Sequence, residues 1–156
     1  MTSAVEVHNS TRVALDEEGV AALVDCVLAA EGAAGAEVGV AFVGERRMRA
    51  LNRVHRAHDA VTDVLAFPLE DVDESLTTAP DGPPRLLGDV VVCPRQALRQ
   101  ARAAGLPPSA ELAVLLVHGT LHLLGYDHET DAGRMALRQA ELLETARWEE
   151  LVEPTS

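Results

Sequence analysis

Residues 118–128 read HGTLHLLGYDH and contain three histidines. Two of them, His118 and His122, are four positions apart inside a long apolar segment. On an α-helix this spacing is about 1.1 turns, so both imidazoles project from the same face. Two imidazoles on one face can bind one metal ion through their ring nitrogens. The spacing therefore predicts a metal site on this helix.

Gly125 explains how the third histidine, His128, reaches the same ion. A continued helix would carry His128 onto a different face and too far along the axis. Glycine readily adopts the left-handed conformation that ends a helix, so the chain can turn back after Gly125. A single histidine in a buried helix is more often a hydrogen-bonded core residue. The full pattern HxxxHxxGxxH instead favours a metal site.

Three nitrogen ligands leave one position of a tetrahedral zinc ion open, whereas structural zinc is usually closed by four protein ligands. An open position favours catalysis, because zinc lowers the pKa of its bound water towards neutrality. The spacing matches the metzincin proteases, in which the second residue is a glutamate that acts as general base. Here that residue is Gly119, so a peptidase is less favoured. Asp127 is a conceivable substitute base, although its commoner role is a supporting hydrogen bond.

The chain has 156 residues, of which 47% are hydrophobic, and this composition is typical of one domain spanning residues 1–156. No apolar window approaches the length that spans a membrane, so no membrane association is expected. The first residues contain no basic stretch followed by an apolar run, so we expect no signal peptide and a cytoplasmic location. Cys26 and Cys93 are far apart in apolar surroundings, and we expect two buried free thiols.

A local basic segment contrasts with the charge of the whole chain. The formal net charge is −12, which argues against nonspecific binding of nucleic acid by the molecule as a whole. Residues 46–56, however, contain five arginines and no acid. The arginines of this segment either form a solvated helix face or contact RNA. His55 and His58, at and after its end, are interpreted as loop residues.

The periodicity of apolar residues predicts the elements that carry these groups. Asp16 is the expected cap of the first helix, and residues 69–85, rich in acids, proline and glycine, are an expected surface loop. The order of elements predicts an α+β fold with a small mixed four-stranded sheet and about five packed helices. The predicted strands cover 5–9, 37–43, 62–68 and 86–94, and the predicted helices cover 16–32, 45–55, 95–105, 107–125 and 129–152.

The segment HGTLHLLGYDH resembles the signature of the YbeY family of bacterial zinc-dependent endoribonucleases, which act in ribosomal RNA maturation. LNRVHRAHDAVTDVLAFP at 51–68 and LLGDVVVCP at 86–94 resemble two further segments of that family, and the order fits over residues 37–147. Two positions depart from the family pattern. Ala57 stands where glycine is common, and Val61 stands where proline is frequent.

The resemblance implies one zinc ion per chain, with His118, His122 and His128 as its ligands on a metzincin-like helix. It also implies that Arg56 is a functional arginine near the metal, suited to binding phosphate. The implied substrate is single-stranded RNA, in particular 16S ribosomal RNA near its 3′ end, in maturation and ribosome quality control. The implied partner is the small ribosomal subunit.

Four further residues are candidates for substrate binding, at positions outside the histidine pattern. They are Arg46, Arg49 and Arg53 on the basic helix and Asp89, which either lines the cleft or only caps a turn.

Two functions from other classes stay open beside the endoribonuclease. One is a ribosome-assembly factor whose zinc is structural and which binds RNA without cutting it. The other, less favoured, is a zinc metalloprotease. The open fourth coordination position favours the nuclease. The sequence indicates no oligomeric state.

Overall fold

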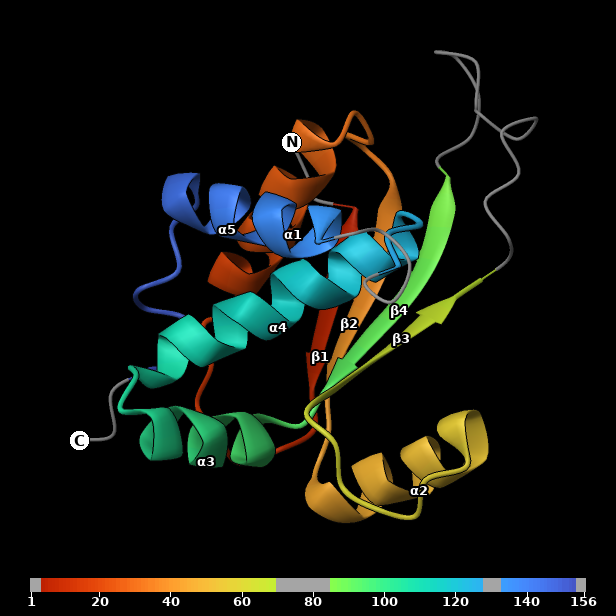
Figure 1. The fold of residues 1–156 in the computed structure, drawn as a ribbon, viewed down its shortest axis with the longest axis vertical. Coiled ribbons are helices and arrows are strands. Elements are labelled where there is room, and N and C mark those ends of the chain that lie inside the picture. Colours follow the sequence, from red (N-terminus) through yellow and green to blue (C-terminus); the bar gives the residue numbers. More distant parts are fainter. Residues whose placement is uncertain (1–3, 70–84, 128–132, 154–156) are drawn as a thin grey trace.

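The computed structural model describes residues 4–69, 85–127 and 133–153. Four strands form one mixed sheet in the order β1-β2-β4-β3 (Figure 1). The first three in that order run parallel, and β3 pairs antiparallel with β4 at the end of the sheet. The strands are β1 (Val5–Asn9), β2 (Glu37–Phe42), β3 (Val64–Pro68) and β4 (Leu86–Val92).

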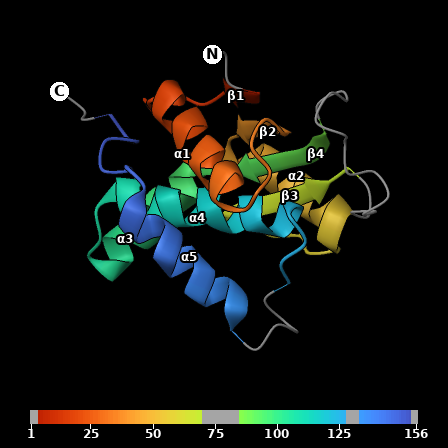
Figure 2. The same cartoon turned by 90° about the horizontal axis from the view of Figure 1, so that it is seen from above.

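Within the described residues five helices pack around the sheet, and the order along the chain is the predicted one. Helix α4 crosses one face of the sheet, and α5 lies on the outer side of α4 (Figures 1 and 2). Helix α2 lies beyond the lower ends of the strands in Figure 1. The α+β fold with a small mixed sheet is therefore confirmed. The helices are α1 (Glu17–Ala30), α2 (Glu45–Arg56), α3 (Pro94–Ala104), α4 (Pro108–Leu123) and α5 (Arg134–Thr145).

The main core lies between the sheet and helices α1 and α4. Alternate residues of β2 enter it, because successive side chains of a strand point to opposite faces: Val38, Val40 and Phe42 are buried. Helix α4 is apolar around most of its circumference and is buried accordingly, as the sequence predicts. None of the described helices is long and apolar enough to cross a membrane.

A second, smaller cluster anchors α2 to the other face of the sheet. Met48 of α2 is fully buried there against Leu65 and Val91. The buried Asn52 donates from Nδ2 to the carbonyl oxygen of Ala60 at 2.9 Å, which ties the loop after α2 back to the helix. These contacts fix the last turn of α2 beside β3.

Two helix ends were predicted correctly. The side chain of Asp16 accepts a hydrogen bond from the backbone N–H of Gly19 at 3.1 Å and caps α1. Gly125 has φ of +99°, so the left-handed residue after α4 lies where the sequence predicts it. Helix α4 is capped at Leu124, one residue before this glycine.

The prediction of a helix running to residue 152 is wrong, because α5 ends at Thr145. Leu151 is buried, and Val152 forms a bridge with Leu15. The backbone N–H of Val152 also donates to the Ser109 hydroxyl at 3.0 Å. Burial of Leu151 and these long-range contacts override the helical pattern. Residues 129–132 of the predicted helix and 70–84 of the predicted loop lie outside the described residues.

Three other expectations need smaller corrections. The third strand begins at Val64 instead of residue 62, because the Asp63 side chain takes the N–H of Val64 at 2.8 Å. The fourth ends at Val92, because Pro94 begins α3. Both cysteines are free and Cys93 is buried, but Cys26 is exposed on α1.

Candidate active site

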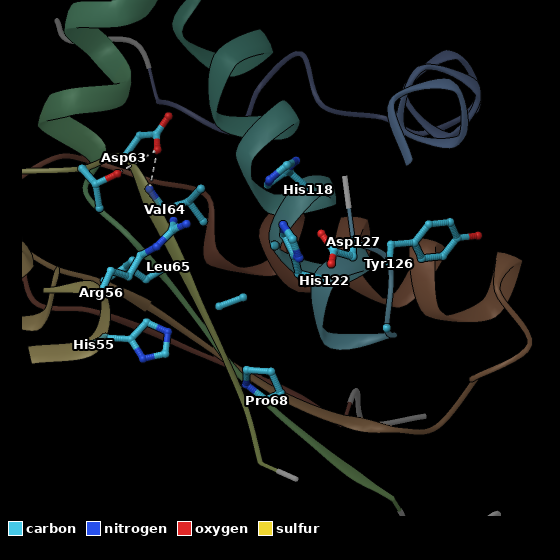
Figure 3. Close-up of a pocket in the computed structure, with 14 residues that line it drawn as sticks. His55, Arg56, Asp63, Val64, Leu65, Pro68, His118, His122, Tyr126 and Asp127 are labelled. Atoms are coloured by element: carbon cyan, nitrogen blue, oxygen red, sulfur yellow. Dashed lines mark hydrogen bonds between the residues drawn. The ribbon is translucent and has the colours of Figure 1, made fainter. Parts of the chain in front are cut away.

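Helix α4 presents His118 and His122 together, as their spacing predicts. Their ring centroids are 4.8 Å apart, and the ring planes meet at 78°. Both side chains are half-buried, and both line one pocket (Figure 3). Imidazoles this close, on one face of a rigid helix, suit a pair of metal ligands.

The His118 ring is oriented by a residue of another helix. Its Nδ1 lies 3.2 Å from the side-chain oxygen of Gln139 on α5. An amide oxygen accepts a hydrogen bond, so this contact favours the tautomer with the proton on Nδ1. That tautomer presents the Nε2 lone pair for coordination, the usual arrangement for a metal-binding histidine whose other nitrogen is held by the protein.

The turn after α4 is tied to two other helices. The Tyr126 hydroxyl donates to Glu31 at 2.8 Å, and Arg138 of α5 forms an ion pair with the same carboxylate. Burial raises the pKa of Tyr126, and the hydrogen bond to Glu31 raises it further. Tyr126 is therefore held to the C-terminal cap of α1, and the same carboxylate links this cap to α5.

The third predicted ligand, His128, lies outside the described residues. Within residues 4–69, 85–127 and 133–153, no group of three histidine, cysteine, aspartate or glutamate side chains is arranged to hold an ion. The described part of the chain thus supplies two ligands of the predicted set, His118 and His122. Their spacing, half-burial and the Gln139 contact fit a zinc site that a third residue completes.

Gly119 lies where α4 packs directly against side chains of β4 and β3. A Cβ atom at this position would lie 2.6 Å from Cγ1 and 3.2 Å from Cγ2 of the buried Val90, and 3.4 Å from Cγ2 of Val64. A side chain at position 119 would therefore point into the core and not into the pocket. The metzincin position of the general base is closed by packing in this fold.

Arg56 forms the opposite wall of the pocket. It is the last residue of α2, and Figure 3 shows its side chain extending over β3 towards the side of the two histidines. Ala57 follows as the helix cap with φ of +58°, in the left-handed region. Glycine is common in the family at this position, and the backbone still adopts the conformation that suits glycine. The departure at Ala57 leaves the turn after Arg56 intact, at a cost of about 1 kcal/mol.

The pocket between these walls has a volume of about 640 Å³. It extends from the end of α2 across β3 to α4 and the turn that follows. It brings together Arg56 and the predicted His118 and His122, and also Asp127. Its lining residues are His55, Arg56, Thr62, Asp63, Val64, Leu65, Ala66, Pro68, His118, Gly119, His122, Gly125, Tyr126 and Asp127.

The other predicted substrate-binding residues do not line this pocket. Arg46, Arg49 and Arg53 are exposed on α2. Arg49 donates from Nε and Nη2 to Asp59 at 2.8 and 3.1 Å, and this contact lowers the pKa of the Asp59 carboxyl. Asp89 is exposed on β4 and belongs to the sheet face opposite α4, where its carboxylate lies over Gly39.

Sequence reasoning missed three residues of the site. His55 belongs to α2 and lines the pocket, so its interpretation as a loop residue is wrong. Asp63 lines the pocket and accepts from Gln100 at 3.0 Å. Gln139 contacts His118 although the two residues are 21 positions apart in the sequence, and no local pattern predicts this contact. The position of His55 directly before Arg56 was the one signal available.

Comparison with known proteins places the chain in a family. The family model described as endoribonuclease YbeY matches residues 5–147. The chain belongs to the YbeY family. The matched range contains both walls of the pocket.

Individual YbeY relatives agree with this assignment. An endoribonuclease YbeY of Anaeromyxobacter sp. (strain Fw109-5) is 52% identical over 127 residues, covering 80% of this chain and 60% of the longer relative. One of Chloroflexus aurantiacus is 42% identical over 147 residues, covering 92% of this chain and 95% of the relative. The solution structure of TM1509 from Thermotoga maritima matches with a TM-score of 0.62 at 26% identity, covering 90% of this chain and 87% of that one.

Proposed function

We propose that this chain is a zinc-dependent endoribonuclease that cuts single-stranded RNA in the pocket between α2 and α4. The observation that carries the proposal is the position of Arg56 across β3 from the paired imidazoles of His118 and His122. A cationic fork facing a metal-binding face is an arrangement suited to a phosphodiester. Membership of the YbeY family supports the same activity.

In this proposal His118, His122 and His128 hold one zinc ion. When bound, the ion supplies Lewis acidity to a phosphate oxygen and to the water beside it. Gln139 holds the His118 ring in its tautomer, and Arg56 binds the scissile phosphate through two parallel hydrogen bonds. RNA provides its own nucleophile in the 2′-hydroxyl, and the bound metal would supply the base that takes the proton of this hydroxyl, so the reaction does not need a side-chain base at position 119.

We further propose that the substrate is ribosomal RNA near the 3′ end of the 16S molecule, during maturation and quality control of the small ribosomal subunit in the cytoplasm. Relatives that carry the name endoribonuclease YbeY support an RNA substrate. The chain acts in this proposal as one domain over residues 1–156. The metalloprotease alternative is disfavoured because the position of its general base, Gly119, packs against Val90.

A cleavage assay with Arg56 variants tests the assignment of roles. Arg56→Ala should slow the cutting of a single-stranded RNA by about a hundredfold or more, because charge stabilisation at the phosphate is lost. Arg56→Lys should be nearly as slow, since an ammonium group cannot donate two parallel hydrogen bonds. Removal of zinc with a chelator should stop cleavage, and added zinc should restore it.

Zinc content and melting temperature are the controls. Both should remain near the parent values in the Arg56 variants, because Arg56 is exposed and is not a ligand. RNA binding without any cleavage by the parent protein would favour the assembly-factor alternative. Cleavage at the parent rate by Arg56→Ala would show that this arginine is a bystander.

A further inference from the structure

One residue of the pocket lining, His55, makes a ring contact that the roles above do not use. The imidazole of His55, on the last turn of α2, lies against the phenyl ring of Phe67 on β3. The ring centroids are 4.2 Å apart, and the planes are tilted by 42°. Phe67 does not line the pocket itself and supports the imidazole from the side of the small cluster.

The two rings differ in exposure. Phe67 is half-buried and packs against the small cluster that anchors α2, so its position is fixed by the core. His55 is exposed and lines the pocket. One side of the imidazole thus rests on a fixed ring, while the residue as a whole faces solvent. The contact with Phe67 already restricts the His55 side chain in the free protein, so RNA binding would cost less side-chain entropy.

The place of His55 connects this platform to the phosphate-binding residue. His55 directly precedes Arg56, and both line the pocket on the same side of β3, as Figure 3 shows. In a nucleotide the base and the phosphate are joined through one sugar. A strand whose phosphate is held by Arg56 therefore brings a neighbouring base close to the His55 ring.

We propose that His55, supported by Phe67, is the platform on which one unpaired base of the bound RNA stacks beside the cleaved bond. The inference rests on the proposed function and adds a determinant of specificity to it. Every base has a π-face, so the platform selects for an unpaired and accessible base and not for a particular one. A base inside a duplex is already stacked on both faces and cannot stack on the platform. The platform therefore favours single-stranded RNA over duplex RNA.

The test uses RNA substrates that lack one base. A single-stranded RNA is made in a series in which each of the nucleotides flanking the cleaved bond is in turn replaced by an abasic one. The parent, His55→Ala and His55→Tyr are compared on each RNA. On the intact RNA, His55→Ala should raise KM by about five- to a hundredfold with a smaller change in kcat, while His55→Tyr should stay near the parent.

One abasic RNA of the series should behave differently from the others. On it the parent should already show the raised KM, and His55→Ala should cause no further rise, because the stacking partner is missing. The control variant is His58→Ala, which removes an exposed histidine three positions along the chain, outside the pocket lining. It should match the parent on every RNA.

The outcomes distinguish failure of the stacking platform from failure of the proposed nuclease function. If His55→Ala raises KM equally on the intact and all abasic RNAs, or if His55→Tyr is as poor as His55→Ala, then His55 only positions α2 and the platform is disproved while the nuclease stands. If the parent cuts none of the RNAs, the proposed function fails and this inference fails with it. Where His55→Ala does not fold, the parent and His55→Tyr still test the platform: it is disproved if no single abasic position raises the KM of the parent.

Discussion

At the scale of single residues, the contact between His118 and Gln139 is the most informative one in the site. The glutamine is half-buried and lies 3.2 Å from the ring nitrogen. A metal ligand that is oriented in this way loses affinity for its metal when the orienting group is removed. We therefore expect the affinity of the proposed zinc site to depend on a residue of another helix.

We expect Gln139→Leu to lower zinc affinity by about 10- to 100-fold, because the His118 ring loses the acceptor that fixes its tautomer. Competition with a zinc chelator of known affinity measures the change. Gln139→Glu, which keeps an acceptor at the same place, should retain most of the affinity. Equal losses in both variants, or no loss in either, would show that the glutamine does not orient the ring.

The part of the site that follows from local spacing was predictable from the sequence. His118 and His122 share a face because four residues make about one helical turn, and Gly125 turns the chain because glycine tolerates positive φ. Gln139 and His55 could not be found in this way. Their roles depend on which helix packs against which strand, and that information is long-range.

At the scale of elements, the approach of α4 to the sheet is set by Gly119. An alanine Cβ would lie 2.6 Å from Cγ1 of Val90, which is fully buried and stiff because valine is branched at Cβ. The same helix carries His118 and His122, which we propose as metal ligands. The packing of this glycine therefore fixes the height of the ligands above β3 and β4.

Gly119→Ala should destabilise the protein by about 1–2 kcal/mol, since overpacking outweighs the gain in helix propensity. Denaturant unfolding of the metal-free protein measures this loss. Val90→Ala should also be destabilising, because it leaves a cavity. Since the two changes relieve each other, the double variant should be more stable than the sum of the single losses predicts. Strict additivity would mean that the clash is relieved elsewhere.

Gly125→Val should destabilise the turn after α4 by about 1–2 kcal/mol or more, because a branched residue is strained at positive φ. We also expect weaker zinc binding, since the chain leaves this turn towards His128. Equilibrium zinc titration and thermal melting measure the two effects. Gly105→Val provides the matched control, because Gly105 has φ of +68° after α3, away from the pocket. It should lose stability while keeping its zinc affinity. Undiminished zinc affinity in Gly125→Val would separate the turn from the metal site.

The elements themselves were predicted well where the pattern was strong, as in the amphipathic helix α2 and the continuous apolar run of α4. The prediction failed at the C-terminus, where an amphipathic pattern continued beyond the real end of α5. Burial of Leu151 and the bridge from Val152 to Leu15 decide the conformation there. Such contacts join residues that are far apart in the sequence, so the pattern of neighbouring residues does not predict them.

At the scale of the whole molecule, charge is divided unequally. The chain carries a net charge of −12, yet Arg46, Arg49, Arg53 and Arg56 recur along α2 at spacings of three and four residues. This spacing places them on one face of the helix. A face of this kind, ending at the pocket, can attract an RNA backbone locally while the rest of the surface repels it.

Replacing Arg46 and Arg53 together by alanine should weaken binding of single-stranded RNA to a similar extent for different sequences. The slope of log affinity against log salt concentration should fall by about 0.7 for each lost phosphate contact. Titrations at several salt concentrations measure both effects. Replacing Arg95 and Arg102 of α3 together by alanine removes the same charge elsewhere and should leave the slope unchanged. An unchanged slope in the α2 variant would mean that this face is only solvated.

The tight seat of α4 on the sheet also limits what can be engineered at this pocket. To convert the site into a peptidase, the first change would be Gly119→Glu, which restores the general base of the metzincin pattern. The new carboxylate would enter the core beside Val90 and not the pocket, so the variant should unfold or lose zinc without gaining any ability to hydrolyse peptides. In the proposed reaction the RNA supplies the nucleophile, and a chemistry that needs a side-chain base at position 119 would first require a larger distance between α4 and the sheet.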